Sequence, residues 1–594
     1  MTSTDRQSIY NQRSSHFSKL LEEKKVIINR VSTARLVTAA VILVFIYLSF
    51  QQALFLIPLG FLVMAFIGWV YWHNKLFLEK THYEHLVTVN TQEVSSLKGD
   101  YSFRDKGQAF QQPDHAYSLD LDIFGEGSLY QYLTRACTYS GKEALANRLG
   151  APVSDKSLIT EYQDAIKQLA QDIEFRQHFL ATGMRTQDSS SDRFQLRAWL
   201  SHPYLFYSIG TFKQLLFVLP ILTVGFIVMS VFFVAVKPIA LLLVLIQLGI
   251  TGFYLKRISV FHDYVSRKKE VLEHYSNLLL IMNSGDFKSS LLVNLQHTSH
   301  EAAEKMAALA SRVRALDARL NFMTSLIVNA LFLYDIQCVY RLEHWKKQNA
   351  SHLEGWLDTI SAMELLNSLA TYAYNNDSFC YASVTDDLSI TAEELAHPLL
   401  QENERIVNSF TLGNPHSVFV VTGANMAGKS TFLRTLGVNM VLALNGAPVC
   451  AKNFICPHII VHTSMRTTDS LKDHQSYFYA ELRRLKTIVE ELQVGQPVLV
   501  LFDEILKGTN STDKLTGSIA LVRQLLKHPC LAVIATHDLL LGNMEQEFPD
   551  RIKNYHFEPT IENDQLSFDY LIKPGVAEKM NATFLMKKMG IISS

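Results

Sequence analysis

The most informative absence in this sequence is that of charge from long stretches of the chain. No aspartate, glutamate, lysine or arginine occurs in residues 36–74 or 214–236, and a further uncharged run follows at 239–255. Charged side chains are almost never found in apolar surroundings, whereas the exposed face of a soluble helix normally carries them. These runs therefore lie either inside a protein core or inside a lipid bilayer.

An excess of charge of one sign is also absent. The 594 residues include 55 basic and 56 acidic side chains. Domains that bind nucleic acid through their overall charge are strongly basic, so any contact with DNA would have to be local here. The sequence also lacks internal repeats and low-complexity tracts, and its length predicts roughly three to five structural units.

Closely spaced cysteine pairs, the usual mark of a structural zinc site, are missing as well. Cys450 and Cys456 are the nearest pair, but no second pair of ligands stands beside them. We therefore expect reduced and mostly buried thiols in a cytosolic compartment. The six cysteines are Cys137, Cys338, Cys380, Cys450, Cys456 and Cys530.

The uncharged runs predict two transmembrane hairpins, at 34–75 and 205–257. About 20 apolar residues suffice to cross a bilayer, so each hairpin can cross twice. Gln51 and Gln52 would form the first turn, and Lys237 and Pro238 the second. Buried core helices of a soluble protein are the alternative. Aromatic residues at one end of the first run, Trp69, Tyr71 and Trp72, favour a membrane interface.

Basic residues flank both hairpins and predict their orientation. By the positive-inside rule, both termini and all the large segments lie in the cytosol. We therefore expect a multi-pass protein of the cytoplasmic (inner) membrane. The flanking residues are Lys24, Lys25, Arg30, Arg35, Lys75 and Lys80 for the first hairpin, and Lys256, Arg257, Arg267, Lys268 and Lys269 for the second.

The remaining segments separate into helical and α/β parts. Apolar residues at helical spacing, with few prolines and glycines, predict helical domains at 76–204 and 258–396, after a short cytosolic segment at 1–33. From His397 to the end, short apolar strands alternate with helices, which indicates a parallel sheet. The predicted strands are 417–422, 458–462, 498–502 and 531–535.

A phosphate-binding loop begins at the end of the first of these strands. Residues 423–431 fit the pattern G-x-x-x-x-G-K-[ST] at every fixed position, and a helix follows. Backbone N–H groups of such a loop point at phosphates; Lys429 would reach the β- and γ-phosphates, and Ser430 would bind Mg²⁺. The predicted nucleotide-binding residues are Gly423, Ala424, Asn425, Met426, Ala427, Gly428, Lys429, Ser430 and Thr431.

Two further strands end in residues suited to phosphoryl transfer. The apolar strand at 498–502 delivers Asp503 and Glu504 to the carboxyl edge of the sheet, where such folds bind ligands. Asp503 would hold Mg²⁺, and Glu504 would polarise the attacking water. His537, after the strand at 531–535, could sense the γ-phosphate or hold that water. The sequence thus predicts an ATP hydrolase with ATP and Mg²⁺ as ligands and with Glu504, His537 and Lys429 as its catalytic residues.

Several motifs together resemble the MutS-type DNA mismatch-repair ATPases. Residues 422–431, T-G-A-N-M-A-G-K-S-T, resemble the family's T-G-P-N-M-G-G-K-S-T, and 503–513 are similar to its D-E-x-x-R/K-G-T-x-S/T stretch. Segment 474–482 resembles the one in which a serine reaches the γ-phosphate held by the other subunit. The resemblance implies that Ser476 binds nucleotide in trans and that two chains form a homodimer.

The resemblance also implies a fold. We expect an α/β P-loop NTPase domain of the ABC/MutS type at 397–594, with a parallel-rich sheet and C-terminal dimerisation helices. An all-α, lever-like region interrupted by the transmembrane hairpins would precede it. Ala424 and Ala427 replace the family's proline and glycine at free positions of the motif, so nucleotide binding should survive. We expect no counterpart of the mismatch-recognition and connector domains of repair members.

We therefore expect a membrane-anchored, MutS-like ATPase that hydrolyses ATP in a dimeric composite site. Mismatched or branched DNA is a candidate partner, and no small-molecule substrate beyond the nucleotide is predicted. An ABC-like transporter ATPase is one alternative, although no Leu-Ser-Gly-Gly signature is present. A membrane scaffold with a regulatory ATPase is another.

Overall fold

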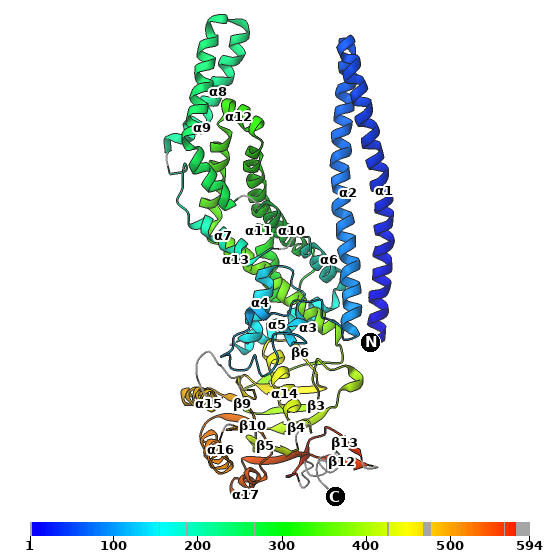
Figure 1. Cartoon of the computed structure of the whole chain (residues 1–594), viewed down its shortest axis with the longest axis vertical. Coiled ribbons are helices and arrows are strands. Elements are labelled where there is room, and N and C mark those ends of the chain that lie inside the picture. Colours follow the sequence, from blue (N-terminus) through cyan, green and yellow to red (C-terminus); the bar gives the residue numbers. More distant parts are fainter. Residues whose placement is uncertain are drawn as a thin grey trace.

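The computed structural model shows two long arms rising from a base that contains the sheets (Figure 1). It describes residues 3–153, 155–185, 188–208, 210–265, 268–424, 427–466, 477–507, 509–562 and 565–577. The first arm is the N-terminal hairpin of two helices. The second arm contains the other hairpin and the long helices that descend to the base.

The first arm consists of α1 (Ser3–Gln51) and α2 (Leu56–Leu97), joined by a short turn of 3₁₀ helix at Ala53–Phe55. The break at Gln52 confirms the predicted turn. Near the base the hairpin packs on the rest of the molecule through Phe17, Leu86 and Ala181. Toward the tip its apolar side chains are exposed, with Phe50 at 85%.

The second arm is built around α8 (Gly210–Phe232) and α9 (Lys237–Val265). The turn between them lies at Val234–Val236, slightly before the predicted tip. Lys237 is already the first residue of α9, and proline is well tolerated in a first helical turn. Within the described residues, four helices are long and apolar enough to cross a membrane, and they are the four predicted ones.

Two long helices connect the second arm to the base. These are α11 (Ser290–Asp317) and α13 (Tyr334–Asn375), which pack on each other along the arm, and a short apolar helix, α12 (Phe322–Phe332), lies between them in sequence. Smaller helices surround α13 lower down. They are α3 (Leu129–Leu133), α4 (Tyr139–Gly150), α5 (Lys156–Gln171), α6 (Ile173–Gly183), α7 (Ser190–Ser201) and α10 (Lys269–Met282).

The helical prediction for 76–204 is wrong for one stretch. Residues 98–128 form turns and irregular backbone, apart from a 3₁₀ turn at Gln108–Phe110. Their conformation is fixed by tertiary contacts rather than by helical periodicity. Asp120, for example, is fully buried against the sheet domain.

The base contains a six-stranded sheet in the order β14-β11-β5-β10-β9-β8. All its neighbouring strands run parallel except β14, which pairs antiparallel with β11 at one edge. The four predicted strands are present as β5, β8, β9 and β10. The strands are β5 (Val418–Gly423), β8 (Ile460–Ser464), β9 (Val498–Asp503), β10 (Cys530–Thr536), β11 (Ile552–Phe557) and β14 (Lys573–Pro574), and the helices of this layer are α14 (Lys429–Leu444), α15 (Tyr477–Val494), α16 (Ser511–Leu525) and α17 (Met544–Glu547).

A smaller sheet in the order β2-β7-β3-β4 lies beside the first, and it corrects the predicted start of the α/β part. Helix α13 ends at Asn375, and three strands precede His397. They pair with later segments of the base, so the α/β part includes residues that we had assigned to the helical domain at 258–396. The remaining strands are β1 (Cys380–Tyr381), β2 (Ser383–Thr385), β3 (Ile390–Leu395), β4 (Asn408–Leu412), β6 (Pro448–Val449), β7 (Asn453–Pro457), β12 (Pro559–Glu562) and β13 (Gln565–Phe568).

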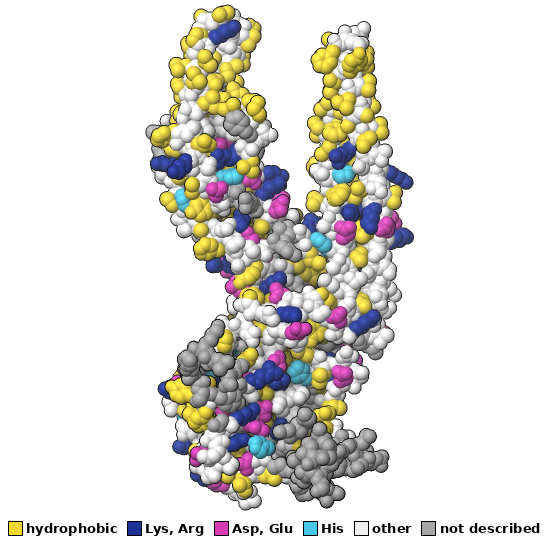
Figure 2. Space-filling model, in the orientation of Figure 1, with side chains coloured by type: hydrophobic (Ala, Val, Ile, Leu, Met, Phe, Trp, Pro, Cys, Tyr) yellow, Lys and Arg dark blue, Asp and Glu magenta, His cyan; other side chains and the backbone are white. Residues whose placement is uncertain are grey.

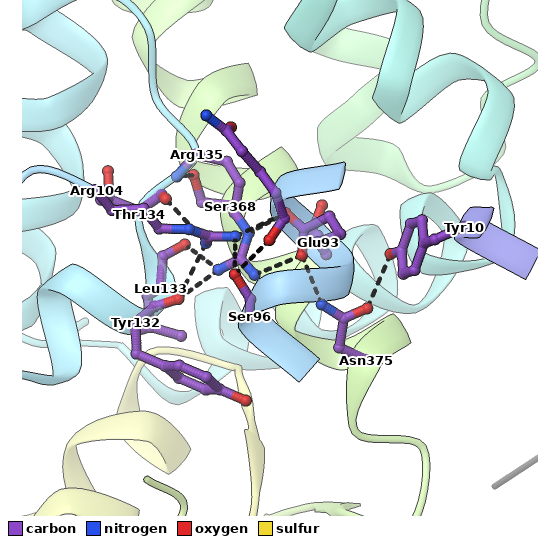
Figure 3. Close-up of polar contacts among 12 residues, drawn as sticks. Tyr10, Glu93, Ser96, Arg104, Tyr132, Leu133, Thr134, Arg135, Ser368 and Asn375 are labelled. Atoms are coloured by element: carbon purple, nitrogen blue, oxygen red, sulfur yellow. Dashed lines mark hydrogen bonds and ion pairs between the residues drawn. The ribbon is translucent and has the colours of Figure 1, made fainter. Parts of the chain in front are cut away.

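A buried polar cluster fastens the first arm to the lower end of α13 (Figure 3). Glu93 of α2 accepts hydrogen bonds from Arg135 on both carboxylate oxygens, at 3.1 and 2.9 Å, and from Arg104 at 2.9 Å. Asn375 donates to the same carboxylate at 2.8 Å and accepts from the hydroxyl of Tyr10 of α1 at 2.8 Å. Both helices of the first arm are thus bonded to the residue at which α13 ends.

Candidate ATPase site

The phosphate-binding loop connects β5 to α14, and its two glycines adopt left-handed backbone. Gly423 has φ of 146° and Gly428 has φ of 105°. A Cβ atom at Gly423 would lie 2.5 Å from the carbonyl oxygen of Phe557, so glycine is required there for space as well as conformation. Asn425 and Met426 fall outside the described residues.

Lys429 begins α14 and folds back over the loop. Its Nζ donates to the carbonyl oxygens of Gly423 at 2.6 Å and Ala424 at 2.9 Å. Burial lowers the pKa of Lys429, while the nearby carboxylates of Asp503 and Glu504 act in the opposite direction. The ammonium group is thus positioned beside the loop, with weak carbonyl acceptors that a phosphate could replace.

Ser430 and Asp503 come together although 73 residues separate them. The Ser430 hydroxyl donates to Asp503 Oδ2 at 2.6 Å. Parallel pairing of β10 with both β5 and β9 brings the carboxyl ends of these strands to one edge of the sheet. A hydroxyl and a carboxylate oxygen suit Mg²⁺, which usually takes one or two protein oxygens and completes its shell with water and substrate phosphates. The residues present therefore fit the predicted magnesium role.

Glu504 and His537 also meet at this edge. His537 Nδ1 lies 2.9 Å from Glu504 Oε1, and Lys514 of α16 lies 3.9 Å from the other carboxylate oxygen. Burial raises the pKa of Glu504, but His537, Lys514 and Lys507 outweigh it and the net shift is downward. Glu504 is therefore a carboxylate at neutral pH. Its backbone has φ of 60°, an uncommon conformation for this residue type, and strain of this kind gathers at functional sites.

Lys429, Ser430, Asp503 and Glu504 line one cavity of about 570 Å³, which is large enough for a nucleotide. One part of its wall carries the predicted phosphate-binding and catalytic side chains. Another part is apolar and aromatic, with Ile406, Phe557 and Tyr570, and includes His397. Burial, with Arg434 close by, lowers the pKa of His397 to about 4, so this ring is neutral at physiological pH.

Comparison with known proteins identifies this part of the chain. The family described as MutS domain V matches residues 419–591, which include all the site residues above except His397 and Ile406. Residues 419–591 belong to the MutS domain V family.

Individual relatives of the MutS-like chain support the same assignment. The DNA mismatch repair protein MutS of Thermotoga neapolitana is 29% identical over 234 residues, which cover 38% of this chain and 29% of that protein. The protein of the same name from Thermotoga maritima is 28% identical over 244 residues, covering 40% and 30% of the two chains. That of Lactobacillus johnsonii is 29% identical over 238 residues, covering 39% and 27%. The match thus spans under a third of the length of these relatives.

Sequence reasoning missed residues that shape the loop after Glu504 in this MutS-like chain. Glu481 of α15 accepts the backbone N–H groups of Leu506 at 2.6 Å and Lys507 at 3.1 Å, and this holds the loop in place. Burial raises the pKa of Glu481. Glu481 lies in the 474–482 motif, so the available signal was its position four residues into a helix that faces the site. Ser476, the residue predicted to act in trans, lies outside the described residues.

A second missed feature links the site to the helical region. Asp120, in the irregular stretch before α3, accepts hydrogen bonds from the Thr463 hydroxyl at 2.7 Å and the Arg466 backbone at 2.8 Å. It also pairs with Arg484 of α15 at 2.8 Å. The next acidic residue, Asp122, pairs with Arg434 of α14 at 3.3 Å. Helices on both sides of the nucleotide site are therefore ion-paired to the same short segment of the helical region.

Proposed function

We propose that this chain is a membrane-anchored, MutS-like ATPase that hydrolyses ATP with Mg²⁺ in a site completed by a second copy. One observation supports the activity above all others. Ser430 and Asp503 share a hydrogen bond, and they line one cavity with Lys429 and Glu504, whose carboxylate contacts His537, within a MutS domain V. This set of groups is what in-line phosphoryl transfer requires.

Each residue has a distinct role in the proposed reaction. Lys429 exchanges its carbonyl acceptors for phosphate oxygens, and the backbone of the loop binds the remaining phosphate charge. Glu504 is ionised and positioned by His537, so it can accept a hydrogen bond from the attacking water and orient it. Mg²⁺, held through Ser430 and Asp503, would neutralise charge that develops on the phosphates.

The exposed apolar surface of both arms supports membrane anchoring. Figure 2 shows hydrophobic side chains gathered over the upper parts of the two arms, which point in the same direction, while charged side chains lie lower down except for a basic one at the tip of the second arm. An apolar surface that covers the upper parts of both arms would drive aggregation in water. Insertion of both arms into one bilayer removes it from water, and we propose a multi-pass location in the cytoplasmic membrane with the ATPase base and both termini in the cytosol.

The contacts inside the second hairpin speak against a transport route. Gln247, the most polar side chain deep in α9, donates to Thr223 of α8 at 2.5 Å. Polar residues commonly join neighbouring helices in membranes in this way. The second hairpin therefore resembles a packed support rather than a solute pathway. We propose DNA, mismatched or branched, as the partner whose binding is coupled to ATP hydrolysis.

ATPase measurements on the full chain in lipid nanodiscs test the activity. Glu504→Gln should lower the turnover rate on the order of 100-fold or more while nucleotide binding survives, because only the water-orienting group is lost. Lys429→Ala should abolish both binding and turnover. Two exposed ion pairs, one within α15 and one between α16 and α17, supply the matched controls Lys486→Ala and Glu547→Gln, which should behave as the unaltered chain. Unchanged hydrolysis in Glu504→Gln would remove the proposed role.

The same preparation tests the partner and the anchor. Stimulation of hydrolysis by mismatched or branched DNA over matched duplex supports the DNA-coupled function, whereas equal rates with and without any DNA contradict it. Extraction of membranes with alkaline carbonate tests anchoring, because a peripheral protein is released and a spanning one is retained.

A further inference from the structure

Helix α12 presents an apolar face that the rest of the described structure does not cover. Leu320, just before it, is 73% exposed, and Met323 and Ile327 are 66% and 56% exposed. Their spacing of three and four residues places them on one face of a helix. Leu326 extends this surface. No acidic or basic side chain occurs from residue 320 to residue 334.

The helix is too short to cross a membrane. Its 11 residues span roughly 16 Å, about half of a bilayer's hydrocarbon thickness. Polar contacts close the loop beneath it: Arg319 pairs with Asp335 at 3.2 Å, and the hydroxyl of Tyr334 donates to the carbonyl of Ala315 at 2.8 Å. Helix α12 therefore caps the adjoining ends of α11 and α13, beside α8 and α9 (Figure 1).

Two hydrogen bonds set the level of α12 along the second arm. Arg319 donates to Ser259 of α9 at 3.3 Å, next to the basic pair Lys256 and Arg257 that ends the uncharged run. Gln337, just after α12, donates to the carbonyl of Leu216 near the start of α8 at 3.0 Å. Basic residues at the ends of membrane spans mark the headgroup level. The apolar face of α12 thus begins where the two proposed spans enter the bilayer.

One polar residue of α12, Asn329, is turned to protein contacts. Asn329 is buried, donates to Ser325 at 3.1 Å and accepts the backbone N–H of Asp335 at 2.9 Å. Asn329 therefore has hydrogen-bond partners inside the arm, whereas the face with Leu320, Met323 and Ile327 is apolar and exposed. A short helix of this kind at headgroup level suits the boundary between headgroups and acyl chains.

We propose that α12 is an interfacial membrane helix that buries Leu320, Met323 and Ile327 in the cytosolic leaflet and seats the ends of α11 and α13 on the bilayer. The inference rests on the proposed membrane anchoring and adds a third contact with lipid. Continuity with the exposed apolar surface of α9, where Val260 is 45% exposed beside Ser259, favours lipid over a second copy of this chain as the occupant.

Depth-dependent fluorescence quenching tests this proposal. Met323→Cys and Ile327→Cys would each carry a thiol-linked fluorophore in the full chain, reconstituted in vesicles of about seven parts phosphatidylcholine to three parts phosphatidylglycerol. The unaltered chain measures background labelling of the native cysteines. Nitroxide lipids labelled near the headgroup should quench both positions more strongly than lipids labelled near the chain end.

Two further positions separate this proposal from the anchoring on which it rests. Phe253→Cys on α9, 76% exposed, should be quenched within the hydrocarbon, and Ser351→Cys near the middle of α13 should not be quenched. Quenching at Phe253 without quenching at Met323 and Ile327 overturns the role of α12 and leaves the anchoring intact. Absence of quenching at Phe253 overturns both. Quenching of α12 chiefly by the deep label also overturns the interfacial position.

Discussion

Glu364 is a buried carboxyl group on α13 that contacts the start of α4. It accepts the backbone N–H groups of Cys137 at 2.7 Å and Thr138 at 3.0 Å, and the Thr138 hydroxyl also donates to it. Burial raises its pKa to about 7, more than these hydrogen bonds lower it. The group therefore changes its protonation near physiological pH, at the joint between α13 and the smaller helices.

This shift predicts a pH-dependent stability. A carboxyl whose folded pKa lies above its unfolded value stabilises the fold fully below the unfolded value, and this contribution is lost as the pH rises through about 7. The loss is on the order of 3 kcal/mol. The melting temperature in detergent should therefore fall between about pH 4.5 and about pH 7 and level off above that.

Glu364→Gln should flatten this dependence, because an amide does not titrate. The exposed Glu301→Gln serves as the control and should leave the slope unchanged. Equal slopes for Glu364→Gln and the unaltered chain would show that another group titrates.

Single residues of the site were predictable where a local pattern carries them. The phosphate-binding loop and the acidic pair at the end of β9 are contiguous motifs, so Lys429, Asp503 and Glu504 could be found without a structure. Glu364 could not, because nothing beside it in the sequence distinguishes a buried acceptor of backbone N–H groups from a solvated glutamate.

At the scale of elements, the first arm depends on Glu93. Burial would raise its pKa, yet the charges of Arg135 and Arg104 lower it to about 2, so it stays ionised. Because a depressed carboxyl pKa stabilises the fold above its unfolded value, this contribution persists at neutral pH and is lost only as the pH falls toward about 2.

Glu93→Gln should destabilise the protein by about 3 to 5 kcal/mol, because it leaves two guanidinium groups buried without a counter-charge. The melting temperature should fall, and limited proteolysis should cut earlier near the junction of α2 with the base. Glu126→Gln breaks an exposed pair with Lys106 and should cost at most about 1 kcal/mol. Similar losses in the two variants would contradict the structural role of the cluster.

A helix or strand was predictable from the sequence when its own residues carry the signal for it. Long uncharged runs and buried parallel strands carry their own signal, so the turns of both hairpins and four strands were predictable, although the helices of the first hairpin extend from Ser3 to Leu97, well beyond the predicted 34–75. Strands β1 and β2 are only two and three residues long and exist through pairing with β6 and β7, about 70 residues away. Helix α12 could not be predicted as a separate element, because a short apolar segment between two long helices resembles a continuation of either one.

At the scale of the whole molecule, the proposed composite site predicts complementation between inactive chains. Lys429→Ala and Ser476→Ala homodimers should each hydrolyse ATP poorly. In a mixed dimer, the intact loop of one chain would face the intact Ser476 of the other. Since half of randomly paired dimers are mixed and each has one complete site, about a quarter of the original activity should return.

ATPase rates of the mixed chains, measured after exchange of subunits in detergent, check this expectation. Two tags, one on each variant, allow mixed dimers to be isolated and counted. Mixed dimers as inactive as either parent would contradict the action of Ser476 in trans while leaving the assignment of Lys429 intact.

Because helix α13 is long, a small tilt at its lower end moves its upper end by a much larger distance. Its 42 residues form a rod of roughly 60 Å between the capping helix α12 and the sheets of the base. A tilt of about 10° at the lower end would sweep the upper end through roughly 10 Å, a stroke longer than most side chains. Small rearrangements around a nucleotide, carried by the Asp120 and Asp122 ion pairs, would thus be magnified into a displacement that neighbouring lipids or a bound partner could register.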